Sequence, residues 1–140
     1  MPFKTILLPV DGSEPSMNAA RLTAQLAGRC HSQVHILHCF SDIPSTIGGE
    51  ARKEEMRLAT AEAEKLMEPY KAIMDKAGIP CATHAAHGDI GQNIVTAVEK
   101  NGCDVIIMGN RGLGSAEGFV LGSISQQVLE LSPVPVLVAR

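Results

Sequence analysis

Hydrophobic residues follow two alternating patterns along this chain: short apolar runs, and longer stretches in which apolar residues recur every three or four positions. The first run, 4–10, shows little polar alternation, which is typical of a strand buried on both faces of a parallel sheet. The longer stretches have the spacing of amphipathic helices. The pattern predicts strands at 4–10, 33–40, 81–87, 103–108 and 132–139, and helices at 14–30, 50–77, 90–100 and 123–131.

Local signals add detail to these elements. Ser13 or Asp11 is expected to cap the first helix. Pro69 is expected to kink or divide the second helix. The third strand is weakly apolar and is expected at a sheet edge. The last strand contains prolines, which cannot donate to a strand ladder, and it therefore also suits only an edge.

The alternation of strands and helices predicts an α/β fold: an open five-stranded parallel sheet with helices on both faces, joined by right-handed crossovers. The sequence contains no internal repeat and no linker, so residues 1–140 are expected to form one domain. Ligands bind such sheets at the carboxyl ends of the strands, where the strand order reverses. The first strand leads into Asp11 and the fourth into Gly109, so these residues share one crevice if their strands are neighbours.

The overall composition argues against membranes and nucleic acids as partners. Hydrophobic residues make up 45% of the chain, and no run approaches the ~18 apolar residues that span a membrane. The formal net charge of −3 and the scarcity of aromatic residues argue against nucleic-acid binding. The N-terminus lacks the pattern of a secretory signal, so a cytoplasmic location is expected.

Neither the cysteines nor the histidines form a recognisable metal-binding pattern. The four cysteines lack C-x-x-C spacing and are interpreted as small buried hydrophobic residues. His35 and His38, like His84 and His87, are three residues apart in predicted strands, so the members of each pair lie on opposite faces and cannot chelate one ion together.

The sharpest chemical feature is the stretch 108–123, where a glycine-rich loop connects an apolar run to a helix. Glycines leave backbone amides uncovered, and a helix N-terminus favours negative charge. The loop contains no Gly-Lys-Ser/Thr and is not a Walker A motif, and Arg111 is its only cation. We expect this loop to hold nucleotide phosphates, with Arg111 either paired with phosphate or simply solvated. The alternative is a flexible connection without a ligand.

Asp11 has two competing interpretations. Its carboxylate could accept hydrogen bonds from ribose hydroxyls, or hold Mg²⁺ through water, or it could cap the first helix. The sequence offers no Ser-His-Asp or Cys-His arrangement and no second acid placed to activate water. Binding is therefore better supported than catalysis.

These features resemble the single-domain, ATP-binding type of the universal stress protein family over essentially the whole chain. The resemblance rests on the opening segment 6–13 (ILLPVDGS), on Leu37-His38-Cys39, on the loop spacing Gly109-x2-Gly112-x9-Gly122-Ser123, and on the ending 132–138. It implies the strand order 3-2-1-4-5, which places the reversal between the first and fourth strands.

The resemblance also implies roles for individual residues. The residues that would line the triphosphate are Gly109, Arg111, Gly112, Gly122, Ser123, Ile124 and Ser125. The residues that would lie near the adenine are Pro9, Val10 and Cys39, with Met108 flanking the loop. Asp11 would meet the ribose. Cys39 is a mild departure, because family members usually carry an aliphatic residue there.

The resulting expectation is a regulatory or stress-response protein that binds ATP, with Mg²⁺. It would form a homodimer through its last strand, from Val134 to Ala139, whose open apolar edge is otherwise an aggregation hazard. Binding would order the glycine loop and the segment 41–49, and so change the surface offered to a protein client. The alternatives are a slow ATPase or an enzyme that transfers adenylyl or phosphoryl groups, an AMP or cyclic-AMP binder, and a nucleotide-free interaction module.

Overall fold

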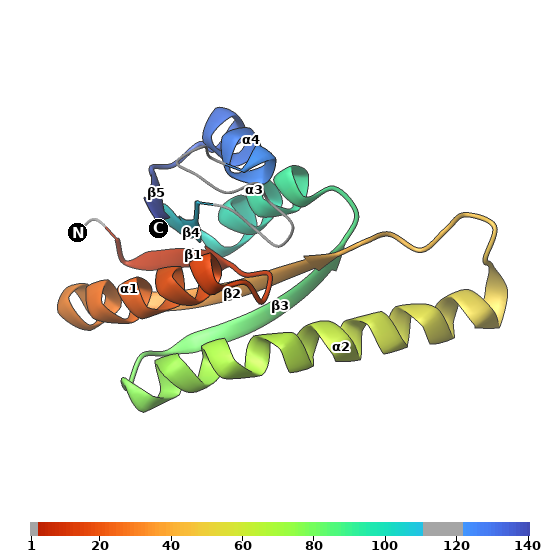
Figure 1. The fold of residues 1–140 in the computed structure, drawn as a ribbon, viewed down its shortest axis with the longest axis horizontal. Helices are drawn as coiled ribbons and strands as arrows, with labels where there is room; N and C mark the ends of the chain where they lie inside the picture. Colours follow the sequence, from red (N-terminus) through yellow and green to blue (C-terminus); the bar gives the residue numbers. More distant parts are fainter. Residues whose placement is uncertain (1–2, 111–121) are drawn as a thin grey trace.

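The computed structural model describes residues 3–110 and 122–140, whose strands and helices alternate as the sequence predicts (Figure 1). The strands are β1 (Thr5–Pro9), β2 (Gln33–Phe40), β3 (Cys81–His87), β4 (Val105–Gly109) and β5 (Val136–Ala139). The helices are α1 (Glu14–Cys30), α2 (Gly49–Lys76), α3 (Ile90–Asn101) and α4 (Ser123–Leu131). Apart from β5, the predicted boundaries agree with these to within two residues.

The strands form one parallel sheet in the order β3-β2-β1-β4-β5, which confirms the predicted fold class and strand order. The chain runs outward from β1 to β3, then returns to place β4 against the other side of β1. The direction of winding therefore reverses between β1 and β4, and their carboxyl ends lie side by side. Both weakly patterned strands, β3 and β5, lie at the edges as expected.

Two helical layers bury the two faces of the sheet. Helices α1 and α2 cover one face, and α3 and α4 cover the other (Figure 1). In β1, Ile6 and Leu8 point into the first layer and Leu7 into the second, and all three are fully buried. Burial on both faces explains why this strand shows no polar alternation. Each such side chain stabilises the fold by about 1.5–3 kcal/mol.

The last strand is shorter than predicted. The sequence suggested 132–139, whereas β5 begins at Val136 and both prolines precede it. Ser132 instead ends α4, and its hydroxyl bonds both the carbonyl and the amide of Val134 in a tight turn. Pro135 has no N–H to give to the ladder, but its carbonyl accepts from Ile106 N–H at 3.0 Å and so leads the chain into the strand.

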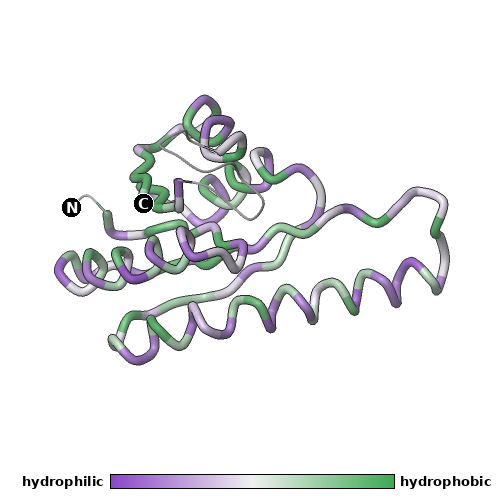
Figure 2. The backbone as a smooth tube through the Cα atoms, in the orientation of Figure 1, coloured by the Kyte–Doolittle hydropathy of each residue, from purple (hydrophilic) through white to green (hydrophobic). Residues whose placement is uncertain are grey.

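Helix α2 is not divided at Pro69, contrary to one of the two expected outcomes. Its buried stripe is formed by Ala63, Met67, Tyr70 and Met74. Figure 2 shows hydrophilic and hydrophobic positions alternating along this helix. Pro69 lies on the exposed side, where water can bond the carbonyl that lacks a proline N–H partner. Packing of the stripe on the sheet keeps the two halves in one helix.

Within the described ranges, no helix combines the length and the hydrophobicity that crossing a bilayer requires.

Candidate functional site

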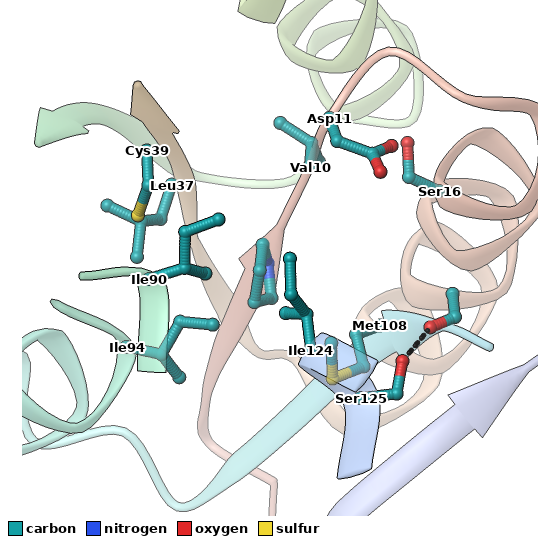
Figure 3. Close-up of a pocket in the computed structure, with 12 residues that line it drawn as sticks. Val10, Asp11, Ser16, Leu37, Cys39, Ile90, Ile94, Met108, Ile124 and Ser125 are labelled. Atoms are coloured by element: carbon teal, nitrogen blue, oxygen red, sulfur yellow. Dashed lines mark hydrogen bonds between the residues drawn. The ribbon is translucent and has the colours of Figure 1, made fainter. Parts of the chain in front are cut away.

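A pocket lies at the carboxyl ends of β1 and β4, where the strand order reverses (Figure 3). The ends of three central strands and the first turns of α1, α3 and α4 form its walls. The lining residues are Pro9, Val10, Asp11, Ser16, Leu37, Cys39, Ile90, Ile94, Met108, Gly109, Ile124 and Ser125. The expected crevice shared by Asp11 and Gly109 is therefore present.

Most of the residues singled out from the sequence meet at this pocket. Those that line it are Pro9, Val10, Asp11, Cys39, Met108, Gly109, Ile124 and Ser125. Gly122 and Ser123 begin α4 next to it and are not part of the described lining. Arg111 and Gly112 lie outside the described residues.

Four lining residues were missed by the sequence analysis: Ser16, Leu37, Ile90 and Ile94. Leu37 could have been found, because it precedes Cys39 by two residues and therefore shares its face of β2. Ile90 and Ile94 are four residues apart on the predicted apolar side of α3, so whichever one reached the pocket would bring the other. Ser16 carries no signal beyond its place in the first turn of α1.

One side of the pocket is apolar. Leu37, Cys39 and Ile90 lie together there, opposite Asp11 and Ser16 (Figure 3). Burial raises the pKa of the Cys39 thiol to about 11, so at neutral pH this side chain is uncharged and packs like a small hydrophobic residue. A surface of this kind suits a flat, apolar ring.

The backbone beside this apolar side is open because β1 ends before β2. The β1–β2 register ends at Pro9 opposite Leu37, and Val10 N–H makes a last bond to the Leu37 carbonyl at 2.8 Å. In a parallel sheet, every second residue of a strand directs its N–H and C=O toward the same neighbouring strand. Leu37 directs these groups toward β1, so the N–H and C=O of Cys39, two residues later, point there as well, at a level that β1 has already left. They offer a donor and an acceptor to the edge of a bound ring.

The polar side is built on the turn from β1 to α1. Ser13 caps α1: its side chain accepts from Ser16 N–H. The Asp11 oxygen Oδ1 accepts from Ser13 N–H at 2.9 Å and from the Ser13 hydroxyl. The N-cap of α1 is therefore Ser13 and not Asp11, which leaves contact with a ligand as the remaining interpretation of Asp11.

Asp11 is held by these bonds in one orientation. Within residues 3–110 and 122–140, its second oxygen, Oδ2, accepts no hydrogen bond. With respect to these described residues, this oxygen is available to accept hydrogen bonds from hydroxyl groups of a ligand or from the water molecules around a cation.

The wall formed by α4 is held in place by Ser125, which links the start of α4 to the end of β4. Its hydroxyl donates to the Gly109 carbonyl at 3.0 Å, the dashed line in Figure 3, and to the Asn110 carbonyl at 3.2 Å. Gly122 N–H donates to the Asn110 carbonyl at 2.8 Å, so both ends of the glycine-rich stretch meet. The Ser125 hydrogen is therefore used within the protein, and this residue offers a ligand only its oxygen lone pairs. Gly122 caps α4 without a side-chain hydrogen bond, so among the described residues no side chain covers the first amides of the helix.

Gly109 is required by close packing. A Cβ atom built at this position would lie 2.7 Å from the backbone carbonyl carbon of Pro15. A Cβ atom essentially never lies this close to another carbon, and the neighbour is backbone that cannot rotate away. The absence of a side chain here lets the first turn of α1 approach the end of β4 and close the pocket from that side.

Within the described ranges 3–110 and 122–140, the side chains of metal-ligating type do not gather into a preformed centre. Among the described residues, no three His, Cys, Asp or Glu side chains are grouped so that they could hold a metal ion. His35 and His84 do approach each other, at 2.8 Å between Nδ1 and Nε2, but across β2 and β3 rather than within either predicted pair. The contact is a hydrogen bond between two rings. Of the cysteines, Cys103 is fully buried, whereas Cys30, Cys39 and Cys81 are partly buried.

The fold and the pocket together define an open α/β sheet protein with a pocket at its strand-order reversal. The model of the universal stress protein family matches residues 2–140, and the chain belongs to this family. The universal stress protein Sll1654 of Synechocystis is 35% identical, over 97% of this chain and 85% of its own. The structure of MJ0577, a universal stress protein of Methanocaldococcus jannaschii, has a TM-score of 0.88 at 29% identity, over 99% of this chain and 96% of its own.

Two further solved structures share the fold at lower identity. A universal stress protein in complex with cAMP has a TM-score of 0.75 at 19% identity, over 100% of this chain and 98% of its own. The universal stress protein of Archaeoglobus fulgidus in complex with dAMP has a TM-score of 0.72 at 20% identity, over 100% of both chains.

Proposed function

We propose that this protein binds ATP in the pocket at the β1–β4 crevice and acts as a nucleotide-dependent regulatory module in a stress response. The observation that carries the proposal is the division of the pocket into two sides. An apolar side with open backbone groups at Cys39 suits adenine, and an oriented carboxylate with one free oxygen at Asp11 suits the ribose. The uncovered amides at the start of α4 suit phosphate.

Adenine nucleotides are bound by relatives with this fold, since solved universal stress proteins hold cAMP and dAMP. These ligands share the adenosine part of ATP, apart from the 2′-hydroxyl that dAMP lacks. AMP or cyclic AMP is therefore the second candidate for this chain. The number of phosphates depends on the stretch 111–121, where the resemblance places Arg111 and Gly112, so we assign these two residues to the triphosphate as part of the proposal.

Mg²⁺ accompanies the nucleotide in this proposal. The described residues supply one oriented carboxylate and no cluster of further ligands, so the ion would be held mainly by phosphate oxygens and would reach Asp11 through water. Asp11 is the one acidic side chain of the described pocket lining, and the proposal assigns it to the ribose, so binding rather than turnover is the proposed activity.

The proposal includes a homodimer in the cytoplasm. Strand β5 lies at the edge of the sheet, and pairing this edge with a second copy would cover its free backbone groups.

The binding site is tested by a matched pair of variants, Gly122→Leu and Gly48→Leu. Both glycines are helix N-caps without a side-chain hydrogen bond and with φ below zero, so leucine costs the two helices similar stability. Only Gly122 adjoins the proposed phosphate site. Titration calorimetry should detect Mg-ATP binding to the wild type and to Gly48→Leu, and none to Gly122→Leu. Equal affinity of Gly122→Leu and the wild type would refute the assignment of the loop.

A further inference from the structure

Tyr70 lies on α2, outside the pocket, yet its hydroxyl reaches the turn that carries Asp11. The side chain is 1% exposed, and its oxygen accepts from Gly12 N–H at 3.0 Å. The same oxygen bonds the hydroxyl of Ser16, a pocket-lining residue. The ring alone would satisfy the apolar stripe of α2, so phenylalanine would suffice if packing were the only requirement.

The donor and the acceptor of each hydrogen bond in this network follow from the bond between Ser16 and Ser13. The Ser16 hydroxyl also bonds the Ser13 carbonyl at 3.0 Å, and a carbonyl can only accept, so the Ser16 hydrogen goes there. Tyr70 must then donate its own hydrogen to Ser16 and accept from Gly12. Burial raises the pKa of the Tyr70 hydroxyl, so the donor stays protonated at neutral pH.

The network encloses the short turn between β1 and α1. Gly12 is held at φ +84°, a conformation that glycine tolerates, and its neighbours Asp11 and Ser13 are joined by two hydrogen bonds. Tyr70 is thus bonded to Gly12 directly. Through Ser16 it is also linked to Ser13, whose hydrogen bonds orient the Asp11 carboxylate. Within the described part of the chain, Tyr70 is the one residue of α2 that makes a hydrogen bond to this turn.

We propose that Tyr70 is a positioning residue for the nucleotide: its hydroxyl fixes the Gly12 turn and thereby the free oxygen of Asp11. This inference rests on the proposed function and names a contact that couples α2 to the ligand. Because coupling is reciprocal, a nucleotide on Asp11 must in turn stabilise the bond from Gly12 to Tyr70.

The test compares Tyr70→Phe with Thr23→Val by titration with Mg-ATP. Thr23 is also fully buried, and within the described residues its hydroxyl bonds only the Ala19 carbonyl of its own helix, so its variant loses a buried hydroxyl away from the pocket. We expect Tyr70→Phe to weaken ATP binding about five- to tenfold, the effect of about one lost hydrogen bond, and Thr23→Val to change it less than about twofold. Both variants should lose thermal stability.

A double variant separates positioning from general structure. If Tyr70 acts through Asp11, Tyr70→Phe should weaken ATP binding little further in an Asp11→Ala background. Full additivity, or a Tyr70→Phe affinity equal to that of the wild type, would overturn the inference while leaving ATP binding intact. A wild-type protein that binds no ATP would overturn the proposed function and this inference with it.

A measurement on the wild type covers the case in which Tyr70→Phe does not fold. Hydrogen exchange of the Gly12 amide should slow several-fold when saturating Mg-ATP is added, while the backbone amide of Thr23 should change less. Unchanged exchange at Gly12 in a nucleotide-bound sample would contradict the coupling.

Discussion

At the scale of single residues, Gly109 shows how close packing constrains the site. The position ends β4 and faces the first turn of α1, where Pro15 leaves no room for a methyl group. A side chain here must push α1 away from β4, and the pocket lies between them.

Gly109→Ala is therefore expected to lower the free energy of unfolding by about 1–3 kcal/mol, since overpacking against backbone forces a shift. Gly28→Ala is the control: Gly28 lies in α1, and an added Cβ meets nothing within 4 Å. That variant should stabilise the protein by about 0.5–1 kcal/mol, because alanine favours helix over glycine. Urea unfolding of the two variants measures the difference. A Gly109→Ala protein as stable as the wild type would show that α1 moves freely.

The residues of the site were predictable from the sequence where they follow directly from strand ends. Asp11, Met108 and Gly109 come at the ends of two apolar runs, and chain order alone places them at one edge of a parallel sheet. Tyr70 was not predictable as a partner of the site, because it belongs to a regular apolar stripe and its hydroxyl reaches Gly12 only through the packing of α2 on α1. Because the ring of a tyrosine fits an apolar stripe, the sequence pattern does not indicate what its hydroxyl bonds.

At the scale of the elements, β2 and β3 are joined by two stacked histidines. His35 Nδ1 and His84 Nε2 are 2.8 Å apart, and the ring centroids are 5.1 Å apart. Burial and, next, the neighbouring His84 lower the pKa of His35, while burial and Lys100 of α3 lower the pKa of His84. This contact could not be predicted from the spacing of histidines within either strand, because it depends on the register that pairs Leu37 with His84.

Stability should consequently depend on pH in a defined direction. The pKa of both histidines is lower in the folded protein than the ordinary value of about 6.5, so the unfolded chain binds more protons as the pH falls through that range. Their contribution is intact above about pH 6.5 and is lost progressively below it. Urea unfolding should therefore give a lower free energy at acidic than at slightly alkaline pH.

A double variant, His35→Gln with His84→Gln, identifies the source of this dependence. Its unfolding free energy should fall less than that of the wild type between the same two pH values. An equally steep decline in the double variant would assign the effect to other groups.

Elements were predicted well in kind and less well at prolines. The strand and helix order followed from apolar periodicity, but Pro69 did not divide α2, and the prolines before β5 shortened the last strand. In α2, packing of the buried stripe outweighed the loss of one helical hydrogen bond. Pro133 and Pro135 lack the N–H that a strand ladder uses, and β5 begins only after them, at Val136.

At the scale of the whole molecule, the open edge of β5 is the feature that suits a second copy. The carbonyl of Pro135 accepts from Ile106 N–H of β4, and that of Ala139 accepts from the N–H of Asn110, the residue that follows β4. Alternate residues address the same neighbour in a parallel ladder, so the N–H groups of Val136 and Val138 point away from the sheet. These groups can pair with the same strand of a second copy across a twofold axis.

Val138→Pro should convert the proposed dimer into a monomer, because it removes one outward donor and no bond to β4. Leu137→Pro is the control, since it removes a donor that points toward β4 and should lower the stability of the subunit itself. Sedimentation equilibrium reports the mass, and urea unfolding reports the stability. A wild type that sediments as a monomer, or a Val138→Pro protein that remains dimeric, would exclude this edge as the interface.

The central claim is that an adenine nucleotide occupies the β1–β4 crevice, and its most direct test is mass spectrometry of the small molecules released when the freshly purified protein is denatured. The account predicts ATP in an amount close to one per chain. Recovery of AMP or cyclic AMP instead would keep the site and change the ligand from ATP to its alternative. A protein that releases no nucleotide and takes up no added Mg-ATP would contradict the account and indicate a nucleotide-free interaction module.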